Sequence, residues 1–159
     1  AALTHDLGKA LTPKHRWPSH PGHEAAGVPL VREMSRRLRV PVETTRLAEI
    51  MSDQHLNMHR LDELRPQTIL KILQKLDAFR KPGRVHKFAL ACQADSQGRG
   101  GEFPSMPYPQ TRQIQTYFEA AQAVDAGSIA RAQTNPRKIA AAIERARIQA
   151  IRSVREQAR

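Results

Sequence analysis

The amino-acid sequence predicts an all-α fold, and three features of its 159 residues support this prediction. Apolar residues recur at intervals of three and four along most of the chain, which is the spacing of a helix with one buried face. No stretch shows the sustained apolar and polar alternation that is typical of a half-buried strand. Prolines and glycines separate the apolar segments, where they can begin or end helices.

The first two predicted helices begin near Pro21 and Pro41. Proline is favoured in the first turn of a helix, because the N–H that it lacks would be unpaired there in any case. The second helix is expected to run toward His55. Both segments have helical apolar spacing, with Val28, Val31, Met34 and Leu38 in the first and Leu47, Ile50 and Met51 in the second.

Two further helices follow. Pro66 opens the first of them, and the Lys-Pro-Gly sequence at 81–83 breaks it. The next runs from about Arg84 to Asp95, with Gly98 in position for a left-handed C-cap. The apolar face of the helix after Pro66 consists of Ile69, Leu70, Ile72, Leu73 and Leu76.

A loop rich in glycine and proline at 99–110 leads to the C-terminal part of the chain. We predict a helix over 108–124, a short one capped by Ser128, and a final helix that begins at Asn135-Pro136 and reaches the chain end. We therefore divide the chain into a domain at 1–104 and a helical tail at 105–159. A chain that is 40% hydrophobic can bury one sizeable core, which favours one domain with an appendage.

The net charge of +11 favours partners that carry phosphate, because a positive field raises their local concentration. Residues 131–159 hold eight Lys or Arg against two Glu. The alternative is that the charge serves only solubility. An aromatic content of 4% argues against a surface that stacks single-stranded bases.

No apolar run approaches the roughly 18 residues of a membrane span, and no secretory leader is visible. We therefore expect a cytoplasmic protein without membrane contact. The single cysteine, Cys92, lies in an apolar stretch and is expected to be buried.

Six of the seven histidines fall within the first 59 residues, which points to a metal site. Imidazole and carboxylate ligands together suit divalent transition metals. If His5 and Asp6 lie on a helix, their side chains diverge by about 100 degrees and can both reach one ion. Gly8 would then allow another element to approach closely. Alone, the pair could equally be a surface hydrogen bond.

Short motifs in this region resemble the HD phosphohydrolase superfamily. The sequence LTHDLGK at 3–9 is similar to its core motif, and PGHEAAG at 21–27 is similar to its following helix start. The order of motifs along the whole chain is similar to bacterial CCA-adding tRNA nucleotidyltransferases with a C-terminal HD domain. These motifs are HDLGK at 5–9, LTP at 11–13, WP at 17–18, GH at 22–23, RLRVP at 37–41, DAFRKP at 77–82, ADSQGR at 94–99 and YP at 108–109.

The resemblance implies an HD-domain helical bundle with a helical C-terminal tail. It also implies a tRNA-associated hydrolase of phosphoesters, with 2′,3′-cyclic phosphodiesterase, 2′-nucleotidase and phosphatase activities. The family's N-terminal nucleotidyltransferase head is expected to be missing here, because no paired aspartates occur in a strand-rich context. We therefore assign no CTP or ATP addition to this chain, and we expect the family's first metal-binding histidine to precede it.

The resemblance assigns His5 and Asp6 as metal ligands and catalytic residues. Asp95 matches the distal aspartate better than Asp77, which could instead pair with Arg80 or Lys81. His23 and His55 are candidate further ligands, although either could contact substrate phosphate or be a capping or partly buried histidine. His15, His59 and His86 are expected at the surface. The family implies a divalent metal, with magnesium or nickel favoured.

Candidate contacts to phosphate or RNA are basic side chains, because arginine can pair with two phosphate oxygens while lysine acts as a point charge. Lys9 is placed in the catalytic site, and the others are Arg80, Arg99, Arg137 and Lys138. The expected partners are tRNA and nucleotide phosphoesters, and a homo-oligomer is compatible with these features. Two other readings are a non-catalytic tRNA-binding module with a vestigial site and a regulatory HD domain acting on signalling nucleotides.

Overall fold

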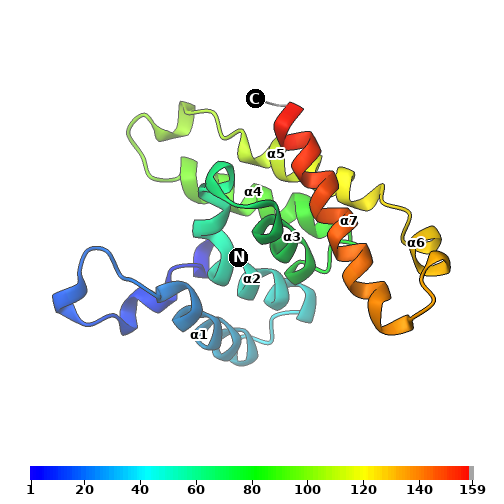
Figure 1. Ribbon diagram of the computed structural model, residues 1–159. Coiled ribbons are helices and arrows are strands. Elements are labelled where there is room, and N and C mark those ends of the chain that lie inside the picture. The colour runs from blue at the N-terminus through cyan, green and yellow to red at the C-terminus, as the bar shows by residue number, and fades with distance from the viewer. Residues whose placement is uncertain (158–159) are drawn as a thin grey trace.

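The computed structural model describes residues 1–157, and its regular elements are all helices (Figure 1). No strand occurs in this part of the chain, so the predicted all-α fold is confirmed. The final helix is tested only to Gln157, since residues 158 and 159 lie outside the described residues. The α-helices are α1 (His23–Arg37), α2 (Val42–His59), α3 (Pro66–Lys75), α4 (Gly83–Gln97), α5 (Gln110–Gln122), α6 (Ala126–Ala132) and α7 (Pro136–Gln157). The 3-10 helices are η1 (Ala2–Thr4), η2 (Leu7–Leu11), η3 (Lys14–Arg16), η4 (Leu61–Glu63) and η5 (Phe103–Ser105).

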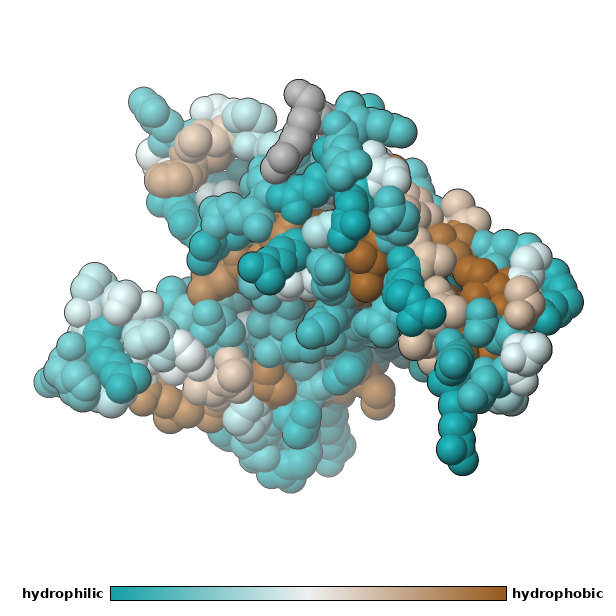
Figure 2. Space-filling view, in the orientation of Figure 1, coloured by the Kyte–Doolittle hydropathy of each residue, from teal (hydrophilic) through white to brown (hydrophobic). Residues whose placement is uncertain are grey.

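A series of helix contacts runs from α1, near the start of the chain, to α7, near its end. Helix α2 packs on α1 and α4, α4 packs on α5, and α7 packs on α5, α3 and α6. Figure 1 shows α7 crossing the α3 and α5 side of the molecule, away from α1. Hydrophilic residues cover most of the face seen in Figure 2, with apolar residues exposed near α6 and α7, in the middle of the face and along its lower edge. None of the described helices is both long and apolar enough to span a membrane.

One hydrophobic core contains residues from α2, α3, α4, α5 and α7. It includes Cys92, which is buried as predicted, together with Ile114 and Ile151 from beyond residue 104. The division of the chain at 104 stays a prediction. The largest fully buried apolar side chains are Phe88, Met51, Met58, Leu61, Ile69, Leu70, Ile72, Leu73, Leu76, Ile114 and Ile151.

The first turns of the chain, α1 and α2 approach one another at glycines. A Cβ on Gly8 would lie 1.9 Å from the backbone oxygen of His23, and a Cβ on Gly27 would lie 2.4 Å from the Ser52 hydroxyl. The Ser52 hydroxyl donates to the backbone oxygen of Glu24 at 3.1 Å. The predicted close approach at Gly8 is thus confirmed, and it brings the start of α1 to the His5-Asp6 segment.

Two predicted helix caps were wrong. Gly98 has a φ of −77° and is not left-handed. The left-handed residues after helices are Arg39 (φ 52°) and Asp77 (φ 55°). In each case the next residue donates a backbone hydrogen bond to the helix five positions back, which satisfies a terminal carbonyl. Helix α6 is capped by Asp125, whose carboxylate accepts the N–H of Ser128, rather than by Ser128.

Helix α7 is joined to the core by Ile151, which is fully buried. We expect Ile151→Ala to lower the free energy of unfolding by about 2–5 kcal/mol, because the methyl groups leave a cavity in a shared core. The measurement is urea denaturation followed by circular dichroism. Ile139→Ala on the same helix is the control, since Ile139 is partly exposed. Equal losses in the two variants would contradict the packing described for α7.

Candidate metal centre

His5 and Asp6 lie in a turn between η1 and η2, and not within an α-helix as predicted. The flanking backbone bonds span three residues, from the Thr4 N–H to the Ala1 oxygen at 3.1 Å and from the Lys9 N–H to the Asp6 oxygen at 2.9 Å. The turn is therefore tighter than an α-helix. The two side chains still reach one place, because His5 Nε2 lies 3.3 Å from Asp6 Oδ2.

The five predicted metal ligands come together from four parts of the chain. His5 and Asp6 come from the first turn, His23 begins α1, His55 lies on α2 and Asp95 on α4. His5 Nε2 lies 3.2 Å from Asp95 Oδ1, and His23 Nε2 lies 3.2 Å from Asp6 Oδ1. His55 Nε2 lies 3.4 Å from His23 Nε2 and 3.7 Å from Asp6 Oδ1. The ligand atoms of His5, Asp6 and His55 all lie within 4.8 Å of one another.

Backbone carbonyls orient all three histidine rings in the same way. His5 Nδ1 lies 2.6 Å from the oxygen of Ala2, and His23 Nδ1 lies 2.7 Å from the oxygen of His20. His55 Nδ1 lies 3.1 Å from the oxygen of Ser52. A carbonyl only accepts hydrogen bonds, so Nδ1 carries the hydrogen in each ring. In the neutral rings, three Nε2 lone pairs therefore point into the cluster.

The carboxylate of Asp6 supplies an acceptor at the centre of the cluster. Its Oδ1 atom is buried and forms no hydrogen bond, although two histidine nitrogens lie within 3.7 Å. A buried acceptor facing other lone pairs is costly unless a cation lies between them. Imidazole nitrogens with carboxylate oxygens form a ligand set that suits a divalent transition metal. The residues present therefore fit a metal ion.

Electrostatics keep the carboxylates of the cluster charged. Burial opposes the charge on Asp95, but the hydrogen bond from His59, and that from His5 when its ring is protonated, bring the pKa of Asp95 well below its ordinary value. Burial likewise opposes the charge on Asp6, and the hydrogen bond from Lys9 outweighs it, so the pKa of Asp6 is lowered. Burial lowers the pKa of His55, which favours the neutral ring that a metal requires.

Two of the predicted phosphate contacts lie at the edge of the cluster. Lys9 Nζ donates to Asp6 Oδ2 at 2.6 Å, and Arg99 Nη2 lies 3.7 Å from Asp95 Oδ2. Both side chains remain well exposed, so each can meet a ligand from solvent. The cluster thus has positive side chains at its rim.

The other predicted phosphate contacts lie elsewhere. Arg80, between α3 and α4, donates to both carboxylate oxygens of Asp77 at 2.7 Å, which is the pairing that the sequence left open. Arg137 and Lys138 are exposed in the first turn of α7, where the side chain of Asn135 accepts the N–H of Arg137.

The sequence prediction missed His59 and Tyr108. His59 was expected at the surface, but its side chain is 16% exposed and its Nε2 lies 2.7 Å from Asp95 Oδ2. Its Nδ1 lies 2.9 Å from the hydroxyl of Tyr108. His59 follows His55 by four residues, one helical turn, and that spacing could have identified it. His15 and His86 are exposed, as predicted.

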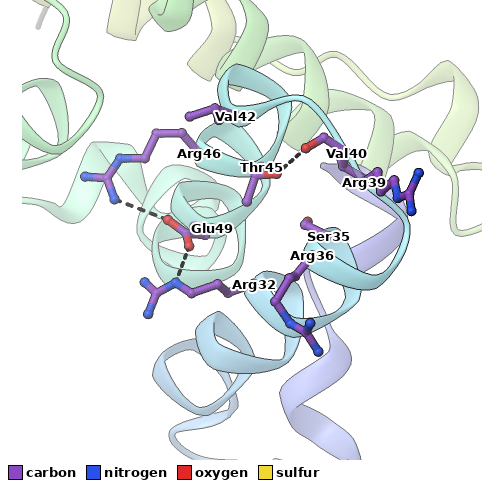
Figure 3. Close-up of a pocket in the computed structure, with 9 residues that line it drawn as sticks. All are labelled: Arg32, Ser35, Arg36, Arg39, Val40, Val42, Thr45, Arg46 and Glu49. Carbon is purple, nitrogen blue, oxygen red and sulfur yellow. Dashed lines mark hydrogen bonds and ion pairs between the residues drawn. The ribbon is translucent and has the colours of Figure 1, made fainter.

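A basic pocket lies toward the opposite ends of α1 and α2 (Figure 3). Glu49 of α2 accepts from Arg32 Nε of α1 at 2.8 Å, which ties the two helices together, and from Arg46 Nη1 of α2 at 3.3 Å. Arg36 and Arg39 also line this pocket. Arg36 is thirteen residues from His23 on α1, a separation of about 20 Å along the helix. The pocket is therefore separate from the histidine cluster.

Comparisons with known proteins agree with this geometry. The HD domain family matches residues 1–81. A Multifunctional CCA protein from Nitrosococcus oceani is 47% identical over 152 residues, which cover 96% of this chain and 37% of the relative. One from Stenotrophomonas maltophilia is 44% identical over 155 residues, which cover 98% of this chain and 38% of the relative. No solved structure matches the chain.

Nearly the whole of this chain is matched, but it spans little more than a third of the length of these relatives. The family match covers the first turn, α1, α2 and α3, and so includes four of the five clustered residues: His5, Asp6, His23 and His55. The fold, the His-Asp pair and the family match agree, and the chain belongs to the HD domain family.

Proposed function

We propose that this chain is the HD-domain portion of a multifunctional CCA protein and that it hydrolyses phosphoric esters with a divalent metal. The expected substrates are 2′,3′-cyclic phosphodiesters, 2′-nucleotides and phosphomonoesters. The observation that carries the proposal is the convergence of three histidine Nε2 atoms on Asp6, with each Nδ1 engaged by a backbone carbonyl.

His5, Asp6 and Asp95 would hold the metal, with His55 and His23 as further ligands. Magnesium and nickel are the favoured ions, and the histidine-rich donor set suits nickel better, because magnesium prefers oxygen ligands. A metal held there would supply Lewis-acid polarisation of a phosphoryl oxygen.

The remaining roles belong to side chains at the rim. Lys9 fixes Asp6 by a hydrogen bond and places a positive charge beside the cluster. Arg99 lies next to Asp95 and can present its guanidinium to a substrate phosphate. A guanidinium can donate two parallel hydrogen bonds to two oxygens of one phosphate. Together they would orient the substrate and offset negative charge that develops on it.

The experiment that tests the proposal is hydrolysis of 2′,3′-cyclic AMP by the metal-stripped chain, before and after addition of magnesium, manganese, nickel or cobalt. We expect activity only with added metal. The same preparation should not add CTP or ATP to tRNA, because a nucleotidyltransferase head is proposed to lie outside this chain. A chain that binds tRNA but hydrolyses nothing with any of these metals would support a non-catalytic binding module.

We also propose that the chain contacts tRNA through its phosphate backbone, with helix α7 as a main contact. The net charge of +11 and the exposed basic residues of α7 support this. The arginines of the α1–α2 pocket offer a second basic surface. Deleting α7 would not be a clean test, because Ile151 belongs to the core.

Exposed side chains of α7 can be neutralised instead. We expect replacement of Arg137, Lys138, Arg145 and Arg152 by glutamine to weaken tRNA binding and flatten its salt dependence. Each lost phosphate contact changes the slope of log affinity against log salt by about 0.9 on duplex-like backbone. The measurement is filter binding at several salt concentrations.

The control replaces four exposed basic residues on other helices, Arg37, Lys71, Lys87 and Arg112, by glutamine. If this control flattens the slope as much as the α7 variant does, the contact with tRNA is not centred on α7.

A further inference from the structure

The two oxygens of Asp95 have different surroundings. Oδ1 faces the metal cluster, 3.2 Å from His5 Nε2. Oδ2 faces away from it, 2.7 Å from His59 Nε2, and Arg99 Nη2 lies 3.7 Å away. The Asp95 side chain is only 11% exposed, so few other groups can reach it. The contact with His59 therefore decides which oxygen is directed toward the cluster.

The ring of His59 is oriented oppositely to the three rings of the cluster. A carboxylate accepts hydrogen bonds, so the Nε2 next to Asp95 carries the hydrogen, and in the neutral ring Nδ1 is an acceptor. The group at Nδ1 is the hydroxyl of Tyr108, at 2.9 Å, which can donate to it. Burial raises the pKa of Tyr108, so the hydroxyl keeps its proton. Tyr108 thereby selects the ring form that donates to Asp95.

Tyr108 belongs to the segment that leads into α5, and α5 is fixed from outside the cluster. The side chain of Gln110, the first residue of α5, donates to the backbone oxygen of His59 at 3.2 Å. The rings of His59 and Tyr108 meet edge to face with centroids 5.8 Å apart. Helix α5 in turn packs on α4 and α7. The position of Tyr108 therefore depends on the docking of α5.

We propose that His59 is a positioning residue for Asp95 and that Tyr108, acting through His59, links metal affinity to the docking of α5. The inference rests on the proposed function, because it assigns Asp95 to the metal. It extends the site past residue 104, where the sequence placed a boundary. Hydrogen-bonded partners of metal ligands orient those ligands, and their loss costs about 10- to 100-fold in metal affinity or activity.

The experiment is a calorimetric titration with Ni²⁺ and with Mn²⁺ at one pH, with melting temperatures recorded for every variant. We expect His59→Leu to bind either metal about 10- to 100-fold more weakly than the wild type. His59→Gln should recover part of the affinity, because its amide N–H can still donate to Asp95. Tyr108→Phe should bind about 10-fold more weakly, since it removes only the hydroxyl.

Tyr117→Phe is the matched control, because it removes a hydroxyl from the buried tyrosine of α5, in the core rather than at the cluster. It should leave metal affinity unchanged. Wild-type affinity in both Tyr108→Phe and His59→Leu would overturn the positioning role while leaving the metal site intact. If the wild type binds neither metal, the proposed function fails and this inference with it. Should His59→Leu fail to fold, Tyr108→Phe and His59→Gln decide the matter.

Discussion

We expect His5→Ala to lose metal binding and phosphoester hydrolysis together. His5 is the residue that bridges the two carboxylates, at 3.3 Å from Asp6 and 3.2 Å from Asp95. Removing the His5 imidazole takes away one metal ligand and leaves the carboxylates of Asp6 and Asp95 without the ring between them. Because loss of a partner that only orients a ligand costs about 10- to 100-fold, loss of the ligand itself should cost at least about 100-fold in both quantities. Asp6→Ala should behave in the same way.

The measurements are metal stoichiometry by elemental analysis and the rate of 2′,3′-cyclic AMP hydrolysis at saturating metal. His15→Ala is the control, since it removes an exposed histidine from η3. It should retain both properties. Hydrolysis that survives in His5→Ala would show that the activity does not come from this cluster. A wild-type chain that binds tRNA but hydrolyses no phosphoester would favour a binding module.

We expect Gly8→Ala to be strongly destabilising. The added Cβ would lie 1.9 Å from the His23 oxygen and 2.7 Å from the Gly27 nitrogen, both of them backbone atoms that cannot rotate away. Overpacking of this kind costs about 3 kcal/mol or more in unfolding free energy. For a chain of this size, that corresponds to a fall of about 6–12 °C in Tm. Metal affinity should fall too, because His23 and the His5-Asp6 turn would be pushed apart.

Gly83→Ala provides the comparison for Gly8→Ala. It lies at the start of α4, where an added Cβ would meet nothing within 4 Å. Alanine is the better helix former, so the change in stability should be neutral or favourable, within about 1 kcal/mol. Thermal melts of the two variants and the wild type test the pair. Equal melting temperatures for Gly8→Ala and Gly83→Ala would disprove the close contact of η2 with α1.

Helix faces could be predicted from the sequence, because burial of one face imposes a period on apolar residues such as Ile69, Ile72 and Leu76. Helix ends were harder. The left-handed positions fall at Arg39 and Asp77, where no glycine marks them, and are held by backbone hydrogen bonds to the ends of α1 and α3. The turn at His5-Asp6 could not be distinguished from an α-helix, because its tighter geometry depends on contacts with α1.

Motifs near one another in sequence identified part of the site, and tertiary packing completes it. The His-Asp pair carries its own signal, and Asp95 was favoured through the resemblance to a family. Tyr108 has no local signal for a role at the site, because the sequence marks it only as part of the YP motif, where the loop at 99–110 meets the predicted helix over 108–124. Its role arises only because α4 and α5 pack together and bring it to His59, 49 residues earlier.

The position of α7 bears on how the chain folds during synthesis. Ile151 completes a core whose other residues lie between Ile50 and Ala121, and the Arg155 guanidinium binds the backbone oxygens of Asp62 and Leu64. These contacts join segments about ninety residues apart, so they form only after α7 has left the ribosome. Until then, the apolar surfaces of α3 and α5 that α7 covers remain open to water, and the nascent chain is expected to be most prone to aggregation in that interval.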